Sequence, residues 1–138
     1  MKIFTKFSLL LVLTIVFCSC TKTTTVAVKN STDYQLSEVI CFGYSGNDVV
    51  HQENIGTIGA GSSSQSFEVD GVEKIQISFK FFINQTYSDR YYTVSKFQIK
   101  EGEDNIITID NDTFISTSSK SSSQDEKTIS SEYKLSSK

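Results

Sequence analysis

Three cysteines and one histidine have the widest chemical scope of the side chains in this sequence. Cys18 and Cys20 stand two residues apart after an apolar run, whereas Cys41 stands alone in the stretch VICFGY. A cysteine becomes a nucleophile when a nearby base or cation lowers its pKa, and no motif around Cys41 supplies one. Cys41 is therefore expected to be a small buried thiol. The sequence has no Cys-X-X-Cys or histidine-rich pattern, so no zinc site is predicted.

The single histidine, His51, would have to serve in any Ser-His or Cys-His pair. It lies in the strand-like stretch VVHQEN, where we expect His51 and Glu53 to face solvent. Carboxylates that could bind Ca²⁺ gather near one late hairpin, but without the spacing of an EF-hand loop. They are Glu101, Glu103, Asp104, Asp110 and Asp112. The sequence therefore predicts no enzyme, no metal site and no other cofactor.

Tyr87, Tyr91 and Tyr92 are candidate ligand-binding residues, because they lie in or just after a turn expected over Asn84 to Asp89. Aromatic rings in such positions can stack on sugars, although Trp, the usual residue for this contact, is absent. Tyr at a strand end more often covers a core with its hydroxyl in water. A glycan-binding module that uses these tyrosines is therefore the alternative function.

The first nineteen residues have the three parts of an export signal. Lys2 and Lys6 form a cationic start, and the apolar run FSLLLVLTIVF follows from Phe7 to Phe17. Eleven residues of helix span roughly 16 Å at about 1.5 Å per residue, which is about half of a bilayer's hydrocarbon core. This run is too short for a stable membrane helix, so residues 1–19 are predicted to be a cleaved signal peptide.

The end of this segment, FCSC, resembles the lipobox of bacterial lipoproteins. Ser19 is the small residue before Cys20, and the polar stretch TKTTT follows. Phe17 stands where Leu is usual, and Cys18 where a small residue is usual. The resemblance implies that the Cys20 thiol receives a diacylglyceryl group, that cleavage occurs just before Cys20, and that the new amine is acylated. The resemblance thus implies a cell-envelope protein that is anchored through Cys20 to a bacterial membrane. The outer membrane is the favoured location, with the protein on its periplasmic or surface face.

The charge of the exported part is negative. The whole chain has a net charge of −3, and cleavage of the leader would remove Lys2 and Lys6 from it. Residues 20–115 hold seven basic and thirteen acidic side chains. An acidic domain without a basic stripe is not expected to bind nucleic acid. The remaining partners, a protein or a glycan, are left open.

From residue 25 onward the pattern is β, with no sustained helical period. The clearest strand has its apolar residues on one parity, from Ile75 to Ile83, with lysines on the other. Asp70-Gly71 before it is a hairpin signal. The expected strands lie near residues 25–30, 36–44, 49–55, 67–69, 75–83, 90–94, 97–99 and 107–115.

Seven or eight short strands at this spacing predict a single antiparallel β-sandwich over residues 25–115. The stretches IGTIGAGSSSQSFEV and FQIKEGEDNIITID resemble those of Ig-like or fibronectin-like modules, which implies an Ig-like sandwich of about seven strands. A small β-barrel is the competing fold. Residues 20–24 are the expected tether, and residues 116–138, with ten serines, are expected to be a disordered tail. The predicted function is a non-enzymatic accessory, interaction or structural role in the envelope.

Overall fold

The computed structural model describes residues 22–119 and 126–132. The predicted signal peptide and Cys20 lie outside these ranges. Within them the chain forms ten strands and one helical turn. The elements are β1 (Thr24–Asn30), β2 (Gln35–Ser45), β3 (Asp48–Ile58), β4 (Phe67–Val69), β5 (Lys74–Ile83), β6 (Thr86–Thr93), β7 (Phe97–Gln98), β8 (Asp104–Ile109), β9 (Phe114–Ser116), β10 (Lys127–Thr128) and α1 (Ile129–Glu132). No helix in the described part of the chain is long and apolar enough to cross a membrane.

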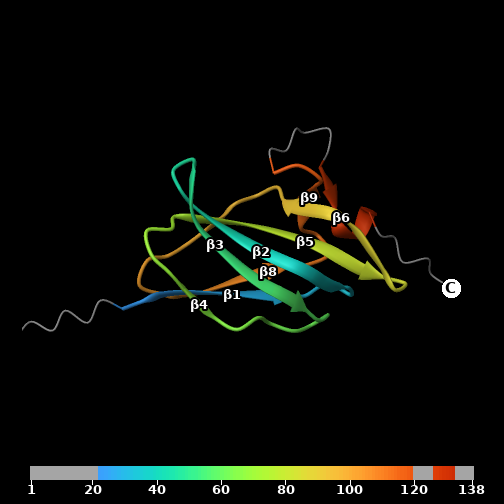
Figure 1. Ribbon diagram of the computed structural model, residues 1–138, viewed down its shortest axis with the longest axis horizontal. Coiled ribbons are helices and arrows are strands. Elements are labelled where there is room, and N and C mark those ends of the chain that lie inside the picture. Colours follow the sequence, from blue (N-terminus) through green and yellow to red (C-terminus); the bar gives the residue numbers. More distant parts are fainter. Residues whose placement is uncertain (1–21, 120–125, 133–138) are drawn as a thin grey trace, which may run out of the picture.

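Two sheets pack face to face, so the predicted all-β sandwich is confirmed (Figure 1). The small sheet has the order β4-β1-β8, and the large sheet has the order β10-β9-β6-β5-β2-β3, with β7 paired to β5. Both sheets turn one parity of their strands inward, as two-sheet packing requires. The fully buried side chains of the core include Val26, Val28, Leu36, Val39, Cys41, Ile75, Ile77, Phe79, Phe81, Ile109 and Ile115.

Two connections differ from the sequence prediction. β1 pairs with β8 in parallel, whereas every other strand pair of the described residues is antiparallel. The Asp70-Gly71 hairpin prediction is wrong, because β4 pairs with β1 and β5 pairs with β2, so the chain crosses between sheets there. Gly71 still supplies a backbone turn, with φ of 63°. A local turn signal does not say which sheet receives the next strand.

Buried Asn30 links the ends of three segments beside the core. Its Nδ2 atom donates to the carbonyl oxygens of Tyr34 at 2.7 Å, Ile58 at 3.1 Å and Gly59 at 3.1 Å. Its Oδ1 atom accepts hydrogen bonds from the backbone N and the hydroxyl of Thr32, at 3.0 and 2.7 Å. One amide group thus binds backbone atoms just after β1, just before β2 and at the end of β3.

Part of the expected disordered tail belongs to the fold. β10 pairs with β9, and Ile129 is completely buried in the core. The backbone N of Ile129 donates to the Thr113 carbonyl at 3.2 Å, and that of Ser130 donates to the Asn111 carbonyl at 2.8 Å. The serine-rich composition of residues 116–138 hides this contact, because a single buried apolar side chain, Ile129, is enough to dock a short strand against β9. Residues 120–125 and 133–138 lie outside the described residues.

Replacing Ile129 by alanine is expected to lower the free energy of unfolding by about 2–4 kcal/mol, because it empties part of a closed core. Urea denaturation followed by circular dichroism would measure the change. Val50→Ala is the matched control, since Val50 is 52% exposed and its truncation should cost little. Equal stability of the Ile129→Ala variant and the wild type would contradict the docking of this segment.

Candidate functional site

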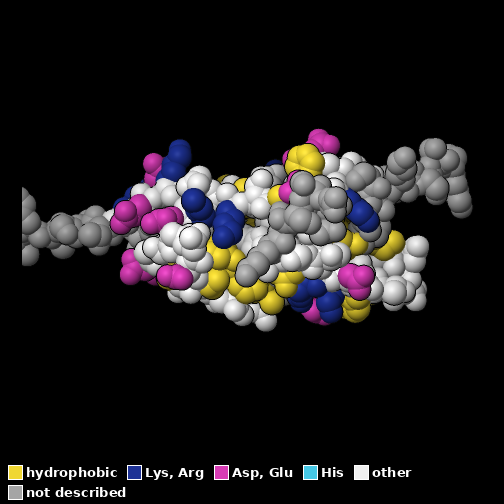
Figure 2. All heavy atoms as spheres, turned by 90° about the horizontal axis from the view of Figure 1, so that it is seen from above, with side chains coloured by type: hydrophobic (Ala, Val, Ile, Leu, Met, Phe, Trp, Pro, Cys, Tyr) yellow, Lys and Arg dark blue, Asp and Glu magenta, His cyan; other side chains and the backbone are white. Residues whose placement is uncertain are grey.

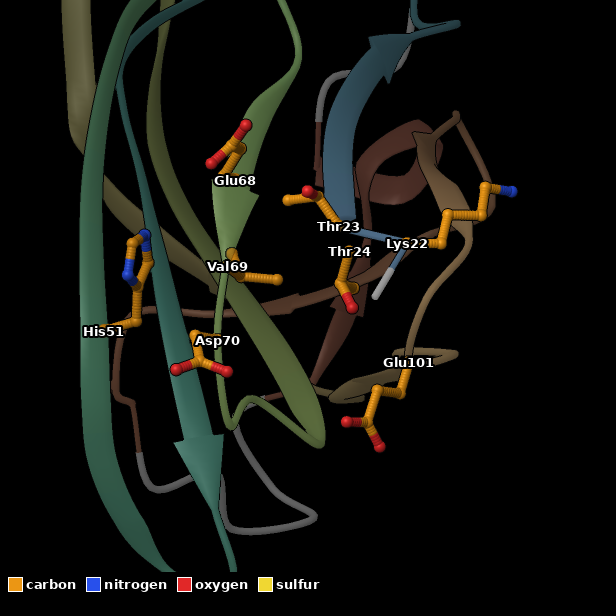
Figure 3. Close-up of a pocket in the computed structure, with 8 residues that line it drawn as sticks. All are labelled: Lys22, Thr23, Thr24, His51, Glu68, Val69, Asp70 and Glu101. Carbon is orange, nitrogen blue, oxygen red and sulfur yellow. The ribbon is translucent and has the colours of Figure 1, made fainter. Parts of the chain in front are cut away.

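An open seam runs along one side of the sandwich, where the edge strands β3 and β4 face each other. We define the seam by Glu53–Thr57 and His51 on β3 and by residues 63–70 around β4. A hollow of about 530 Å³ lies at the end of the seam that is next to the start of β1 (Figure 3). A second hollow, of about 400 Å³, continues along both segments. The first is lined by Lys22, Thr23, Thr24, His51, Glu68, Val69, Asp70 and Glu101.

The His51 side chain lies inside this seam and is only 26% exposed, so the prediction that it faces solvent is wrong, whereas the Glu53 side chain is 43% exposed and does reach solvent. Its ring stacks on Phe67, with centroids 6.0 Å apart and planes 2° from parallel. Its Nε2 atom lies 4.0 Å from Glu53 Oε2 and has no hydrogen-bond partner among the described groups. The physical reason is that β3 is an edge strand: the short β4 covers its inward parity only in part, so polar side chains are tolerated there.

The five acidic residues expected near one hairpin are divided between the two ends of β8. Asp104 accepts a hydrogen bond from the Thr25 hydroxyl at 2.7 Å, at the start of that strand. Asp110, past its end, accepts from the Thr113 hydroxyl at 2.9 Å and from the backbone N of Asp112 at 3.1 Å. A six-residue strand separates the ends by roughly 17 Å at about 3.3 Å per residue. Within residues 22–119 and 126–132, no group of three metal-binding side chains is present.

Cys41 is buried in the core, as predicted. Burial, and secondly the Glu53 carboxylate, raise the pKa of the Cys41 thiol from 9.0 to about 12. The thiol is therefore neutral at physiological pH and is not available as a thiolate nucleophile.

The raised pKa of Cys41 predicts a loss of stability in alkaline solution. Between pH 9 and 12 the unfolded chain releases this proton while the folded chain retains it, so the free energy of unfolding falls as the pH rises. Urea midpoints at about pH 8 and about pH 10.5 would measure the effect, with Cys41→Ala as the control that lacks it. A fall of the same size in both proteins would contradict the assignment.

The three candidate tyrosines do not form one surface. All lie on β6, which begins at Thr86 directly after a tight turn at Asn84 and Gln85, whose φ angles are 51° and 63°. Tyr87 is 55% exposed, with its ring centroid 4.9 Å from that of Phe82. Tyr91 is only 6% exposed and faces the core, and Tyr92 lies on the opposite face near Phe42. The separation of Tyr91 from Tyr92 could be predicted from strand alternation, because neighbouring residues of a strand point to opposite faces.

The outer face of the large sheet carries a bulge with an ion-pair cluster. Glu38, with φ of 49°, binds Lys80 at 3.1 Å and Arg90 at 2.7 Å through its carboxylate. The hydrogen bond from Lys80 is the largest cause that holds the pKa of Glu38 below its ordinary value. Lys96 lies over the Tyr44 ring at 3.5 Å. Figure 2 shows hydrophobic side chains gathered on the face seen from above, with Lys and Arg side chains beside them.

No family model matches the sequence, and a comparison with curated proteins finds no match. Among solved structures, the chain is similar to an NMR structure of a protein from Eubacterium rectale, with 20% sequence identity and a TM-score of 0.49. This match covers 66% of the present chain and 80% of the other. What the domain does is therefore inferred from its own surfaces and side chains.

Proposed function

We propose that this chain is a lipid-anchored protein of a bacterial cell envelope, with the outer membrane as the favoured location. We further propose that its β-sandwich is a binding module without catalytic activity. The observation that carries the proposal is the leader with Ser19 and Cys20 at its end, directly before a folded domain. A membrane is thus one partner, through acyl chains on Cys20.

The length of the tether supports this proposal. β1 begins at Thr24, four residues after Cys20, and four extended residues reach at most about 14 Å. An acylated Cys20 would hold this end of the sandwich close to the bilayer. Figure 2 shows Asp and Glu side chains together with Lys or Arg side chains at the end of the molecule where the described chain begins. Such a mixed end is not a basic patch for anionic lipid, so the acyl chains rather than surface charge would supply the membrane affinity.

The binding role is supported by the seam. It is an elongated groove with both apolar and charged residues, and recognition sites commonly combine the two. Cys41 does not offer a nucleophile, because its thiol is buried and its pKa is raised to about 12. His51 is held between Phe67 and Glu53, an arrangement that fits a wall of a groove.

Intact-mass measurement of the protein purified from envelopes tests the anchoring. The expected mass is that of residues 20–138 plus a diacylglyceryl group and an N-acyl chain. A mass of residues 20–138 alone, or of the full chain, would overturn the proposal. Density-gradient separation of inner and outer membranes then tests the expected location.

A further inference from the structure

β3 is a long edge strand with an unused hydrogen-bonding side. It has eleven residues and lies last in the order of the large sheet, paired only with β2 among the described strands. In an edge strand, alternate peptide groups point away from the neighbouring strand and can pair with another chain. Proline, which would block such pairing, is absent from the whole sequence.

The seam lies directly beside this free edge. One of its hollows is lined by Glu53, Asn54, Ile55 and Thr57 of β3 and by residues 63–67 opposite them. The other brings His51 of β3 together with residues 68–70 (Figure 3). A strand added to β3 would therefore find space on its inward parity for alternate side chains, which is how added strands gain specificity.

The negative charge of the seam favours an extended segment that carries basic side chains. Glu53, Glu68 and Asp70 belong to the seam, Glu101 lines the first hollow beside it, and Lys22 is the one lysine or arginine in the two linings. Glu53 lies on the inward parity of β3, because it is the register partner of the fully buried Cys41 on β2. An inward charge on an edge strand discourages unspecific pairing, and a cation on the incoming strand would offset it.

We propose that β3 is a docking edge for an extended, lysine- or arginine-bearing segment of another protein, which pairs with the strand and lays its basic side chains into the seam. This inference rests on the proposed function as a binding module, and it names the surface and the partner class.

Two other arrangements fit less well. Pairing of β3 with a second copy would bring the acidic seams of two molecules together, which like-charge repulsion opposes. The free edge of β8 has an adjoining hollow of about 340 Å³ and an Ile106 that is 70% exposed. It is shorter, with six residues against the eleven of β3, so it offers fewer backbone hydrogen bonds.

Hydrogen exchange on the full chain, purified from envelopes in detergent, tests the proposal with two defined probes. One is an eight-residue peptide of alternating Lys and Val, and the other alternates Glu and Val. The basic peptide is expected to slow exchange of the outward amides of β3 and to bind more weakly as salt is raised. The acidic peptide is expected to have no effect. Equal binding of both peptides, protection confined to β8, or no protection would each overturn the proposal.

Matched variants sharpen this test. Glu53→Gln is expected to weaken binding of the basic peptide about two- to fivefold, the range of one partly exposed ion pair. Asp89→Asn, which removes an exposed carboxylate from β6, should leave binding unchanged. Equal effects of the two substitutions would show that the peptide is held by unspecific charge attraction, and this result would overturn the assignment. Protection of β3 that appears without peptide, with a dimer mass, would assign the edge to self-association instead.

Failure of this inference can be separated from failure of the anchoring. The peptide experiment is performed in detergent and does not depend on attachment to a bilayer. A lipidated protein that does not bind the basic peptide would support the anchoring and contradict the docking edge. A protein without acyl chains that binds the peptide would support the docking edge and contradict the anchoring.

Discussion

Replacing Cys20 by serine is expected either to release the protein from the membrane fraction or to stall it as an uncleaved precursor. The reason is chemical: a serine hydroxyl does not form the thioether that carries the diacylglyceryl group. Each buried methylene contributes about 0.8 kcal/mol, and two or three acyl chains together give firm attachment where a single chain gives only marginal binding. Fractionation followed by immunoblotting would measure the shift, which should involve most of the protein.

Cys18→Ala is the control for this experiment, because it changes the predicted leader two residues away and leaves the Cys20 thiol in place. It is expected to mature and fractionate like the wild type. Metabolic labelling with an alkyne fatty acid would mark the wild type and the Cys18→Ala variant, but not the Cys20→Ser variant. Normal processing and tight membrane retention of the Cys20→Ser protein would remove the basis of the proposed function.

Replacing Asn30 by aspartate is expected to destabilise the fold by about 3–5 kcal/mol at neutral pH, although the two side chains have nearly the same shape. The amide donates to three carbonyl oxygens, and a carboxylate in its place would face them with no proton to donate. The site is completely buried, so water cannot relieve the repulsion. Chemical denaturation at about pH 7 would measure the loss.

The pH dependence distinguishes this cause from a general packing defect. Burial and the facing carbonyls raise the pKa of the introduced carboxyl, so acidification restores a proton and one hydrogen bond. The stability gap between the variant and the wild type should therefore narrow as the pH falls toward about 4. Asn54→Asp, at an exposed position of β3, should cost little at either pH. A gap for Asn30→Asp that does not change with pH would contradict this account.

The fold was predictable wherever alternation was undisturbed. β5 has apolar residues on one parity, from Ile75 to Phe81, and that pattern directly identifies a strand with one face in the core. Side-chain alternation does not specify partners, however. The crossing at Asp70-Gly71 and the parallel pairing of β1 with β8 depend on contacts between distant segments, which no local pattern encodes.

The candidate site was less accessible from the sequence, for the same reason. His51 reads as an exposed strand residue because the three residues after it, Gln52 to Asn54, are polar, but the exposure of an edge strand depends on what covers its inner face. The opposite wall, around Phe67 and Glu68, is supplied by a segment far from His51 in the strand order. Adjacent Tyr91 and Tyr92, in contrast, had to point to opposite faces of any strand, and that constraint was already visible in the sequence.

The parallel pairing of β1 with β8 has a mechanical consequence. Six residue pairs join the two strands, from Thr25 with Asp104 to Asn30 with Ile109. A pull on the N-terminus, resisted by the later part of the chain, would load these rungs together in shear instead of unzipping them one by one. If the tether bears tension between a bilayer and a captured ligand, the sandwich is expected to resist extension at the strand that receives the force first.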